Sequence, residues 1–175
     1  MKETGLIQIY TGGGKGKSTA AFGLSLRAAG WGLRTAIVQF MKNGEGYGEI
    51  KAFTAQPLID VYSFGGNKWF TKGESLQDED LNCVREAMGK TEELMADRSV
   101  DLLILDEFFN AIYFDLVSER DALILISSKR PDQELVLTGR NASPTFLDLA
   151  DLVTEMKELK HPYQKGVQAR RGIEY

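Results

Sequence analysis

Short apolar runs alternate along this chain with longer stretches in which apolar residues recur at helical spacing. The runs rich in Val, Ile, Leu and Phe predict β-strands, and apolar residues three or four positions apart predict helices. Residues 102–105 are apolar throughout, which is typical of a strand buried on both faces. Because strands alternate with helices, we expect an α/β fold in which a mostly parallel sheet is flanked by helices. The predicted strands are Leu6–Tyr10, Thr35–Phe40, Ile59–Phe64, Leu102–Asp106, Glu134–Thr138 and Leu152–Met156, and the predicted helices are Ser18–Ala29, Asp78–Asp97, Arg120–Ser128 and Pro144–Ala150.

Several residues indicate where these helices begin and which side is apolar. Ser75 and Asp78 fit a capping box before the longest helix, and Ser143 followed by Pro144 fits an N-cap and a first helical residue. Cys83, the one cysteine of the chain, falls at an apolar position of the longest helix. We interpret it as a small core residue rather than a nucleophile. A single cysteine excludes an internal disulfide.

The segment 10–19, with the sequence YTGGGKGKST, connects the first predicted strand to the first predicted helix. Its small residues allow backbone N–H groups to surround phosphate oxygens, and the helix N-terminus adds a partial positive charge. The usual pattern G-x-x-x-x-G-K-[ST] has glycine where this chain has Thr11, so a lysine-bearing glycine turn is the alternative interpretation. We predict a P-loop in which Lys17 contacts phosphate oxygens and the Ser18 hydroxyl ligates Mg²⁺. The predicted nucleotide contacts are Thr11, Gly12, Gly13, Gly14, Lys15, Gly16, Lys17, Ser18 and Thr19.

Two further strands end in charged side chains. The apolar run 102–105 is followed by Asp106 and Glu107, and at least one of these carboxylates is expected to hold Mg²⁺, directly or through water. Arg140 follows Thr138 and Gly139 and is expected to bind a phosphate, with a surface salt bridge as the alternative. The sequence therefore predicts a P-loop NTPase-like fold of the RecA type that binds a nucleoside triphosphate with Mg²⁺, with Lys17, Glu107 and Arg140 as the predicted catalytic residues.

Glycine-rich stretches follow two of the predicted strands. Residues 44–48 and 65–73 both come after the carboxyl end of a strand, where open α/β sheets bind ligands. We expect them to be active-site loops, and surface loops without a role are the alternative.

Composition limits the partners and the number of domains. The 175 residues fit one domain spanning 1–175, and a net charge of −4 with 43% hydrophobic residues gives no general footprint for nucleic acid or acidic membranes. The basic residues near the C-terminus form a local exception to this charge balance. They could be a solvated segment or could contact a phosphate or carboxylate, and the sequence does not decide between these two interpretations. The first residues leave no room for a signal peptide and no apolar run reaches 18 residues, so we expect a cytoplasmic protein without a membrane span. These basic residues are Lys157, Lys160, Lys165, Arg170 and Arg171.

The one histidine, His161, precedes Pro162. No second histidine or cysteine lies near it at the spacing of metal ligands, so a zinc-type site is not expected. A structural hydrogen bond is the favoured role, and a general base is the alternative.

Taken together, these motifs resemble the ATP:corrinoid adenosyltransferases of the cob(I)alamin or cob(I)yrinic acid a,c-diamide type. The resemblance covers nearly the whole chain, and Thr at the first P-loop position is a feature of that family. It is carried by residues 9–23, 38–42 (VQFMK), 101–107, 138–140 (TGR), 150–156 (ADLVTEM), 160–163 (KHPY) and 166–175 (GVQARRGIEY).

The resemblance implies transfer of the 5′-deoxyadenosyl group of ATP to the Co(I) of a corrinoid, with triphosphate as the leaving group. Co(I) is the nucleophile, so the protein supplies positioning and charge stabilisation. It also implies that Gln39, Trp69 and Phe70 contact the substrates, with the two aromatic residues in the corrin pocket. The implied partners are a flavoprotein reductant and a second subunit in a homodimer.

The sequence departs from the family pattern in three places. Lys72 stands where the family often has a tryptophan after Phe-Thr. The family's Asp-Glu-Leu-Asn is replaced by Asp-Glu-Phe108-Phe109, which displaces Asn110 by one position. Longer members also carry an N-terminal extension that can cover the corrin. These differences leave two alternatives open: a P-loop ATPase or phosphotransferase, and a non-catalytic paralogue that binds nucleotide or corrinoid.

Overall fold

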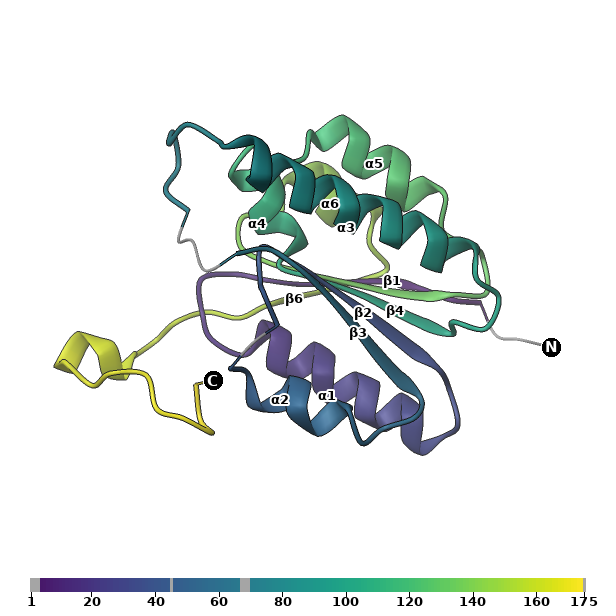
Figure 1. The fold of residues 1–175 in the computed structure, drawn as a ribbon, viewed down its shortest axis with the longest axis horizontal. Helices are drawn as coiled ribbons and strands as arrows, with labels where there is room; N and C mark the ends of the chain where they lie inside the picture. The colour runs from purple at the N-terminus through teal and green to yellow at the C-terminus, as the bar shows by residue number, and fades with distance from the viewer. Residues whose placement is uncertain (1–3, 45, 67–69, 175) are drawn as a thin grey trace.

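A parallel β-sheet forms the central layer of the protein, with helices on both of its faces (Figure 1). The computed structural model describes residues 4–44, 46–66 and 70–174. Helices α1 and α2 cover one face of the sheet, and α3, α4, α5 and α6 cover the other. The expected α/β fold with a P-loop is therefore confirmed.

The strands lie close to their predicted positions. Four of them have the predicted bounds. The first strand is shifted by one residue toward the C-terminus, and the last strand ends one residue earlier than predicted. The strands are β1 (Ile7–Thr11), β2 (Thr35–Phe40), β3 (Ile59–Phe64), β4 (Leu102–Asp106), β5 (Glu134–Thr138) and β6 (Leu152–Glu155).

The four predicted helices form with ends shifted by one residue, and three short helical segments were not predicted. The predicted set is α1 (Lys17–Gly30), α3 (Asp78–Ala96), α5 (Glu119–Ser127) and α6 (Pro144–Leu149), and the unpredicted set is α2 (Gly48–Phe53), α4 (Phe108–Tyr113) and the 3₁₀-helix η1 (Pro162–Lys165). Each unpredicted segment has at most six residues, which is too short for a helical period to emerge.

The sheet has the strand order β3-β2-β4-β5-β1-β6, and every neighbouring pair is parallel. Strand β1 leads into the P-loop and β4 ends at Asp106, and β5 lies between these two strands. Parallel strands end at the same edge of a sheet, so the P-loop, the carboxylates and the residues after β5 are brought to one edge.

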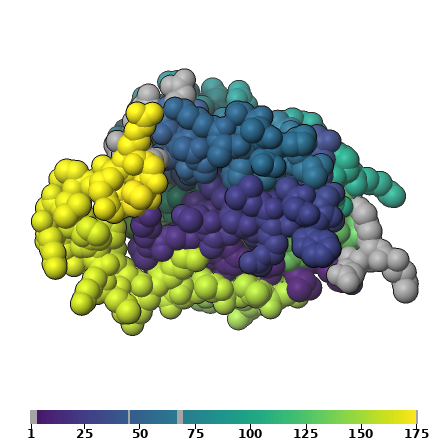
Figure 2. All heavy atoms as spheres, turned by 90° about the horizontal axis from the view of Figure 1, so that it is seen from below, coloured from purple at the N-terminus to yellow at the C-terminus, as the bar shows by residue number. Residues whose placement is uncertain are grey.

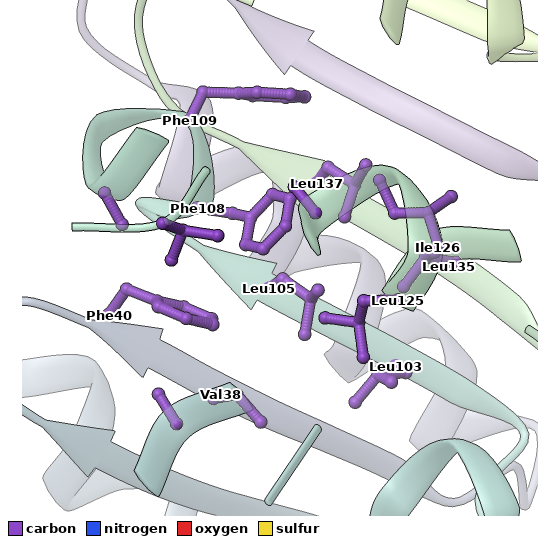
Figure 3. Packing of buried hydrophobic residues seen from close by; sticks show 14 of the residues in the cluster. Val38, Phe40, Leu103, Leu105, Phe108, Phe109, Leu125, Ile126, Leu135 and Leu137 are labelled. Carbon is purple, nitrogen blue, oxygen red and sulfur yellow. The ribbon is translucent and has the colours of Figure 1, made fainter. Parts of the chain in front are cut away.

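The core has two parts because alternate residues of each strand point to opposite faces. Leu103 and Leu105 of β4 contribute to the larger cluster under α3 to α6, whereas Leu102 and Ile104 pack against α1 and α2. All of β4 is buried, as its continuous apolar sequence predicts. In the larger cluster, Phe108 points toward Phe40, Leu105 and Leu137 (Figure 3), and its ring centroid lies 5.3 Å from that of Phe40.

Two predictions about α3 are wrong. Its capping box is formed by Gln77 and Asp80, not by Ser75 and Asp78: the Asp80 carboxylate accepts a hydrogen bond from the Gln77 backbone N–H at 3.0 Å. The helix begins two residues later than a cap at Ser75 requires. Cys83 is half-buried and not enclosed in the core, because the most buried positions of the helix are those of Val84 and Ala87.

Ser143 does occupy the N-cap of α6 with Pro144 in the first turn, but its hydroxyl donates to Glu119 instead of capping the helix.

Strand β6 is an edge strand whose four residues are all exposed. The chain then runs past the P-loop and folds into a C-terminal segment, residues 157–174, at one end of the molecule (Figures 1 and 2). No helix in the part of the chain that the structure describes is long and apolar enough to cross a membrane.

Candidate active site

Four strands deliver chemically active side chains to the same edge of the sheet. The P-loop follows β1, Lys42 follows β2, Asp106 ends β4, and Arg140 follows β5. The predicted convergence of the P-loop with the carboxylates is therefore present.

The P-loop is fixed by β6 and by the loop after β5. The Thr11 carbonyl accepts from the Met156 N–H at 2.8 Å, and the Gly14 N–H donates to the Met156 carbonyl at 2.6 Å. A Cβ at Gly12 or Gly14 would lie 2.5 or 2.7 Å from that carbonyl oxygen, so only glycine fits. The Thr11 hydroxyl accepts from the Ala142 N–H at 3.4 Å, which gives the threonine at the first loop position a structural role.

Two consequences follow for phosphate binding by the loop. The Gly14 N–H is already bonded to Met156, so Gly14 contributes through its small size rather than as a donor. The N–H groups of the first turn of α1, from Lys17 to Thr19, have no intrahelical acceptor and point out of the helix N-terminus. Gly16 caps this helix with a φ of 116°, a conformation suited to glycine.

The Lys17 side chain is folded back over its own loop. Its Nζ donates to the carbonyls of Gly12 at 2.9 Å and Gly14 at 2.8 Å, and the residue is 8% exposed. Burial lowers the pKa of Lys17, and the nearby Arg140 and Lys42 charges act in the same direction, whereas Glu107 and Asp106 oppose them. The ammonium is therefore a desolvated donor between the loop and the carboxylates.

Asp106 is fully buried and hydrogen-bonded on both oxygens. Its Oδ2 accepts from Lys42 Nζ at 2.7 Å and from Gln39 Nε2 at 3.2 Å, and its Oδ1 accepts from the Thr138 hydroxyl at 2.8 Å. Burial alone would raise the pKa of Asp106, but the Lys42 charge and the hydrogen bonds from Lys42, Ser18 and Thr138 outweigh it and lower the pKa. The Asp106 carboxylate is thus ionised and held in place at the centre of a hydrogen-bond network.

Glu107 is the more accessible carboxylate, with 23% of its side chain exposed. Its Oε1 lies 3.7 Å from Lys42 Nζ, and its Oε2 accepts from the Asn110 side chain. Burial raises the pKa of Glu107, and the neighbouring Asp106 charge adds to the effect. The backbone of Glu107 is left-handed, with φ at 60°, and its N–H donates to the Thr138 hydroxyl at 3.0 Å.

Backbone conformations that side chains rarely adopt gather at this edge. Met41 after β2, Glu107 after β4 and Asn141 after β5 all have φ at 60°. Such conformations cost of order 1–3 kcal/mol each and persist where the surroundings enforce them. They let the chain turn sharply at the strand ends and aim the adjacent side chains across the edge.

Three residues of the network were missed from the sequence. Lys42 bonds both carboxylates, Thr138 connects Asp106 to the Glu107 backbone, and Asn110 connects Glu107 to the Arg140 N–H, which donates to Asn110 Oδ1 at 2.8 Å. A position at or just beyond the carboxyl end of a strand was a usable signal for Thr138 and Lys42. Asn110 could be recognised only once α4 was known to place it one turn after Glu107.

Several predicted site residues take other positions. Gln39 is fully buried beneath Asp106, and its Oε1 accepts from the Ser63 hydroxyl at 2.8 Å, so it supports the carboxylate and does not face a ligand. Arg140 is exposed, and among the described residues it forms no ion pair, so the surface salt bridge is not found there. Thr19, Lys15 and Gly13 lie on the exposed side of the loop.

The region expected to contact a corrin lies beside α4. Trp69 lies outside the described residues, as do parts of both glycine-rich loops. Phe70 is half-buried and stacks on Phe114 with ring centroids 5.8 Å apart. Lys72 bonds the Tyr113 carbonyl and the Asp115 carboxylate, so its charge is held at the C-terminus of α4.

The C-terminal segment reaches back to the P-loop. Lys15 Nζ donates to the Ile173 carbonyl at 3.0 Å, and Arg170 pairs with Glu174 at 3.0 Å. A hydrogen bond from Arg170 lowers the pKa of Glu174 to about 2. His161 Nδ1 accepts from the Tyr163 N–H at 3.2 Å and caps η1, so its predicted structural role is confirmed.

The ligands at this edge fit a magnesium ion bound together with phosphates. The edge offers two carboxylates and the Ser18 hydroxyl, and no group of three or more His, Cys, Asp or Glu side chains suited to a metal occurs in the described part of the chain. Mg²⁺ is usually bound by one or two carboxylates plus substrate phosphates and water.

Comparison with known proteins agrees with this geometry. Residues 3–175 match the family model described as ATP:corrinoid adenosyltransferase BtuR/CobO/CobP. The chain is 35% identical over 177 residues to a corrinoid adenosyltransferase of Sinorhizobium sp, covering 99% of this chain and 81% of that protein. It is 32% identical to the corrinoid adenosyltransferase of Escherichia coli K12 (99% and 87%) and 34% identical to that of Pseudomonas aeruginosa (99% and 85%).

Proposed function

This chain belongs to the ATP:corrinoid adenosyltransferase family, and we propose how its residues carry out adenosyl transfer from ATP to a corrinoid. The observation that carries the proposal is the placement of a buried P-loop lysine and two carboxylates at one sheet edge. This edge binds the triphosphate of ATP and activates it as a leaving group.

In the reaction, the electron pair of Co(I) forms a bond to C5′ of ATP. The C5′–O bond breaks, and its electrons pass to the triphosphate oxygen. The cobalt is the nucleophile, so no side chain has to attack. The protein's part is to hold C5′ in line with cobalt and to stabilise the charge that develops on the triphosphate.

Lys17 and the N–H groups of the first turn of α1 are the principal donors to the triphosphate. On nucleotide binding, the Lys17 ammonium exchanges the Gly12 and Gly14 carbonyls for phosphate oxygens, which are stronger acceptors. Arg140, exposed at the same edge, adds a second positive charge.

Ser18 and Glu107 would hold Mg²⁺, with Asp106 behind them as the anchoring carboxylate. When bound, the metal neutralises charge on the triphosphate. Asp106 already accepts hydrogen bonds from Lys42, Gln39, Thr138 and Ser18. Glu107 is partly exposed, so it would be the direct ligand.

The corrinoid side of the site is formed by the loop that follows β3, in which Phe70 supplies an aromatic contact. The family resemblance also implies a contact from Trp69, which lies outside the described residues. Support comes from the position of this loop after β3, at the same sheet edge, and from the packing of Phe70 on α4. The substitutions at positions 72 and 109 do not remove groups from the phosphate edge: Lys72 bonds α4, and Phe109 is a core residue.

The protein's wider setting follows the family resemblance. We propose a cytoplasmic homodimer that receives Co(I) corrinoid through a flavoprotein reductant. The exposed edge strand β6, with Leu152 and Val153 more than 40% exposed, is a surface on which a second copy could pair.

An anaerobic assay tests the proposed activity. The protein is mixed with MgATP and chemically reduced cobalamin, and the visible spectrum is followed. Conversion of the cob(I)alamin spectrum into that of adenosylcobalamin is expected. Binding of ATP and corrinoid without this conversion would favour the non-catalytic alternative.

A further inference from the structure

The two carboxylates of the site are bridged by a cation that belongs to the protein. Lys42 Nζ lies 2.7 Å from Asp106 Oδ2 and 3.7 Å from Glu107 Oε1, and its side chain is only 16% exposed. The ammonium therefore lies where a cation shared by both carboxylates would lie. It is held there from β2, whose last residues are all buried.

The other carboxylate oxygens of Asp106 and Glu107 already accept hydrogen bonds. The Thr138 hydroxyl bonds Asp106 Oδ1, and the Asn110 amide bonds Glu107 Oε2. A divalent ion arriving alone would meet two carboxylates, one hydroxyl and a resident ammonium. That is a poor set for Mg²⁺, which prefers six oxygen ligands and loses its water reluctantly.

The triphosphate changes this balance. It supplies several anionic oxygens next to Ser18 and Glu107, and these compensate for the positive charges of Lys17 and Lys42. The same ion that is repelled when it arrives alone is then attracted as part of a phosphate complex.

We propose that Lys42 is a positioning residue that holds Asp106 and Glu107 in place and keeps free divalent cations out, so that the metal enters only with the triphosphate. The inference rests on the proposed function, because it assumes that Glu107 and Ser18 are the metal ligands. It assigns Lys42 a role in the order of binding rather than in the transfer step.

Mn²⁺ is a suitable probe, since its binding to protein is measured by water-proton relaxation without any turnover. Wild-type protein and the variants Lys42→Met, Lys42→Arg and Lys51→Met are titrated with Mn²⁺ alone. Lys51→Met is the matched control, because it removes one positive charge from an exposed residue of α2 that forms no ion pair with Asp106 or Glu107 in the part of the chain that the structure describes. Lys42→Met should bind Mn²⁺ at least about tenfold more tightly than wild type, equivalent to about 1.4 kcal/mol. Lys42→Arg and Lys51→Met should behave as wild type.

A second titration uses wild-type protein alone, so it does not depend on the folding of a variant. Mn²⁺ binding by the wild type should be weak by itself and should strengthen at least about tenfold when inorganic triphosphate is added. Thermal unfolding of each variant is measured in parallel. Tight Mn²⁺ binding by the wild type without triphosphate would overturn the proposal, and so would equal binding by wild type and a folded Lys42→Met.

These outcomes are separate from those of the adenosylation assay. If the wild type fails to adenosylate cob(I)alamin but shows the expected Mn²⁺ behaviour, the proposed activity is wrong and the role of Lys42 stands. If adenosylation occurs and Lys42→Met gains no Mn²⁺ affinity, only the role of Lys42 is wrong.

Discussion

Lys17 is the residue whose charge is best placed to act on the triphosphate. Its ammonium is desolvated and held by two loop carbonyls in the structure described. Replacing it with alanine should lower the rate of adenosylation by about 10²–10³, the usual cost of losing one preorganised donor. Steady-state rates measured beside those of Lys51→Ala, a surface control, would check this. Rates equal to wild type in Lys17→Ala would contradict the P-loop assignment.

Glu107 is predicted to act on the metal and Asp106 to anchor the network. Glu107→Gln removes the accessible carboxylate but keeps an oxygen within reach of Asn110. The Mg²⁺ concentration for half-maximal activity should rise about 10- to 100-fold, as for other losses at a metal site. A Mg²⁺ titration of the activity gives the answer. If the Mg²⁺ dependence of Glu107→Gln equals that of wild type, Glu107 is not the metal ligand and Asp106 takes that role.

Gly139 is required by both its backbone and its surroundings. Its φ is 141°, and a Cβ there would lie 2.8 Å from the Phe109 Cβ and 2.9 Å from the Phe109 nitrogen. Gly139→Ala should lower the free energy of unfolding by about 1–3 kcal/mol, visible as a fall in Tm. Gly23→Ala is the control, because a Cβ at this helical position meets nothing within 4 Å and should be neutral or stabilising. Similar Tm values for both variants would show that the turn after β5 tolerates a side chain.

Among the elements, α4 connects the two halves of the site. Its first turn carries Glu107 at the N-cap and Asn110, and its last turn contacts Phe70 and Lys72. Its first two residues, Phe108 and Phe109, are buried in the core (Figure 3). The phosphate side and the proposed corrin side are therefore built on one short, well-packed helix.

A substitution at Phe70 shows whether this residue contacts the corrin or only packs against its neighbours. Phe70→Ala should impair use of cob(II)alamin with a flavin reductant much more than use of pre-reduced cob(I)alamin, because displacing the lower axial ligand needs an apolar surface. The affinity for ATP should stay near that of wild type. Phe114→Ala removes the ring on which Phe70 stacks and serves as the packing control. Equal losses in both assays with a markedly lower Tm would identify Phe70 as a packing residue only.

The elements that could be predicted from the sequence are those long enough to show a regular pattern of apolar residues, and the short elements without such a pattern were missed. Strand β4 could be placed because its residues are apolar on both faces and end in carboxylates. Helix α4 begins directly after Glu107 with two phenylalanines and has six residues, which are too few for a helical period to be recognised in the sequence. The capping box of α3 was predicted at the wrong residues because several neighbouring side chains can cap a helix. Which of them does so depends on the residue at which the backbone becomes helical.

The same limit applies to the site. Lys17, Asp106 and Glu107 were predicted because their motif fixes their place relative to a strand. Lys42 and Thr138 come from separate strands, and only the order of β2, β4 and β5 in the sheet brings them to Asp106. A strand order depends on tertiary packing, which local patterns do not determine.

At the scale of the whole molecule, the chemistry occupies one edge of the sheet. A groove between α3 and α5, lined by Met95, Leu125 and Arg130, lies at helix ends that precede β4 and β5 and so belongs to the opposite edge. Met156, just after β6, and the C-terminal segment, through Ile173, both hydrogen-bond the P-loop. The fold thus brings the P-loop, the two carboxylates and the end of β3 to one edge of the sheet.

The central claim is that this edge holds triphosphate as a leaving group, and the fate of the phosphates tests it most directly. The protein is incubated anaerobically with MgATP and cob(I)alamin, and the phosphate products are separated by anion exchange while adenosylcobalamin is quantified by its spectrum. The account predicts one triphosphate for each adenosylcobalamin formed, with no ADP. Formation of ADP and phosphate without adenosylcobalamin would contradict it and identify an ATP-hydrolysing or phosphoryl-transferring enzyme instead.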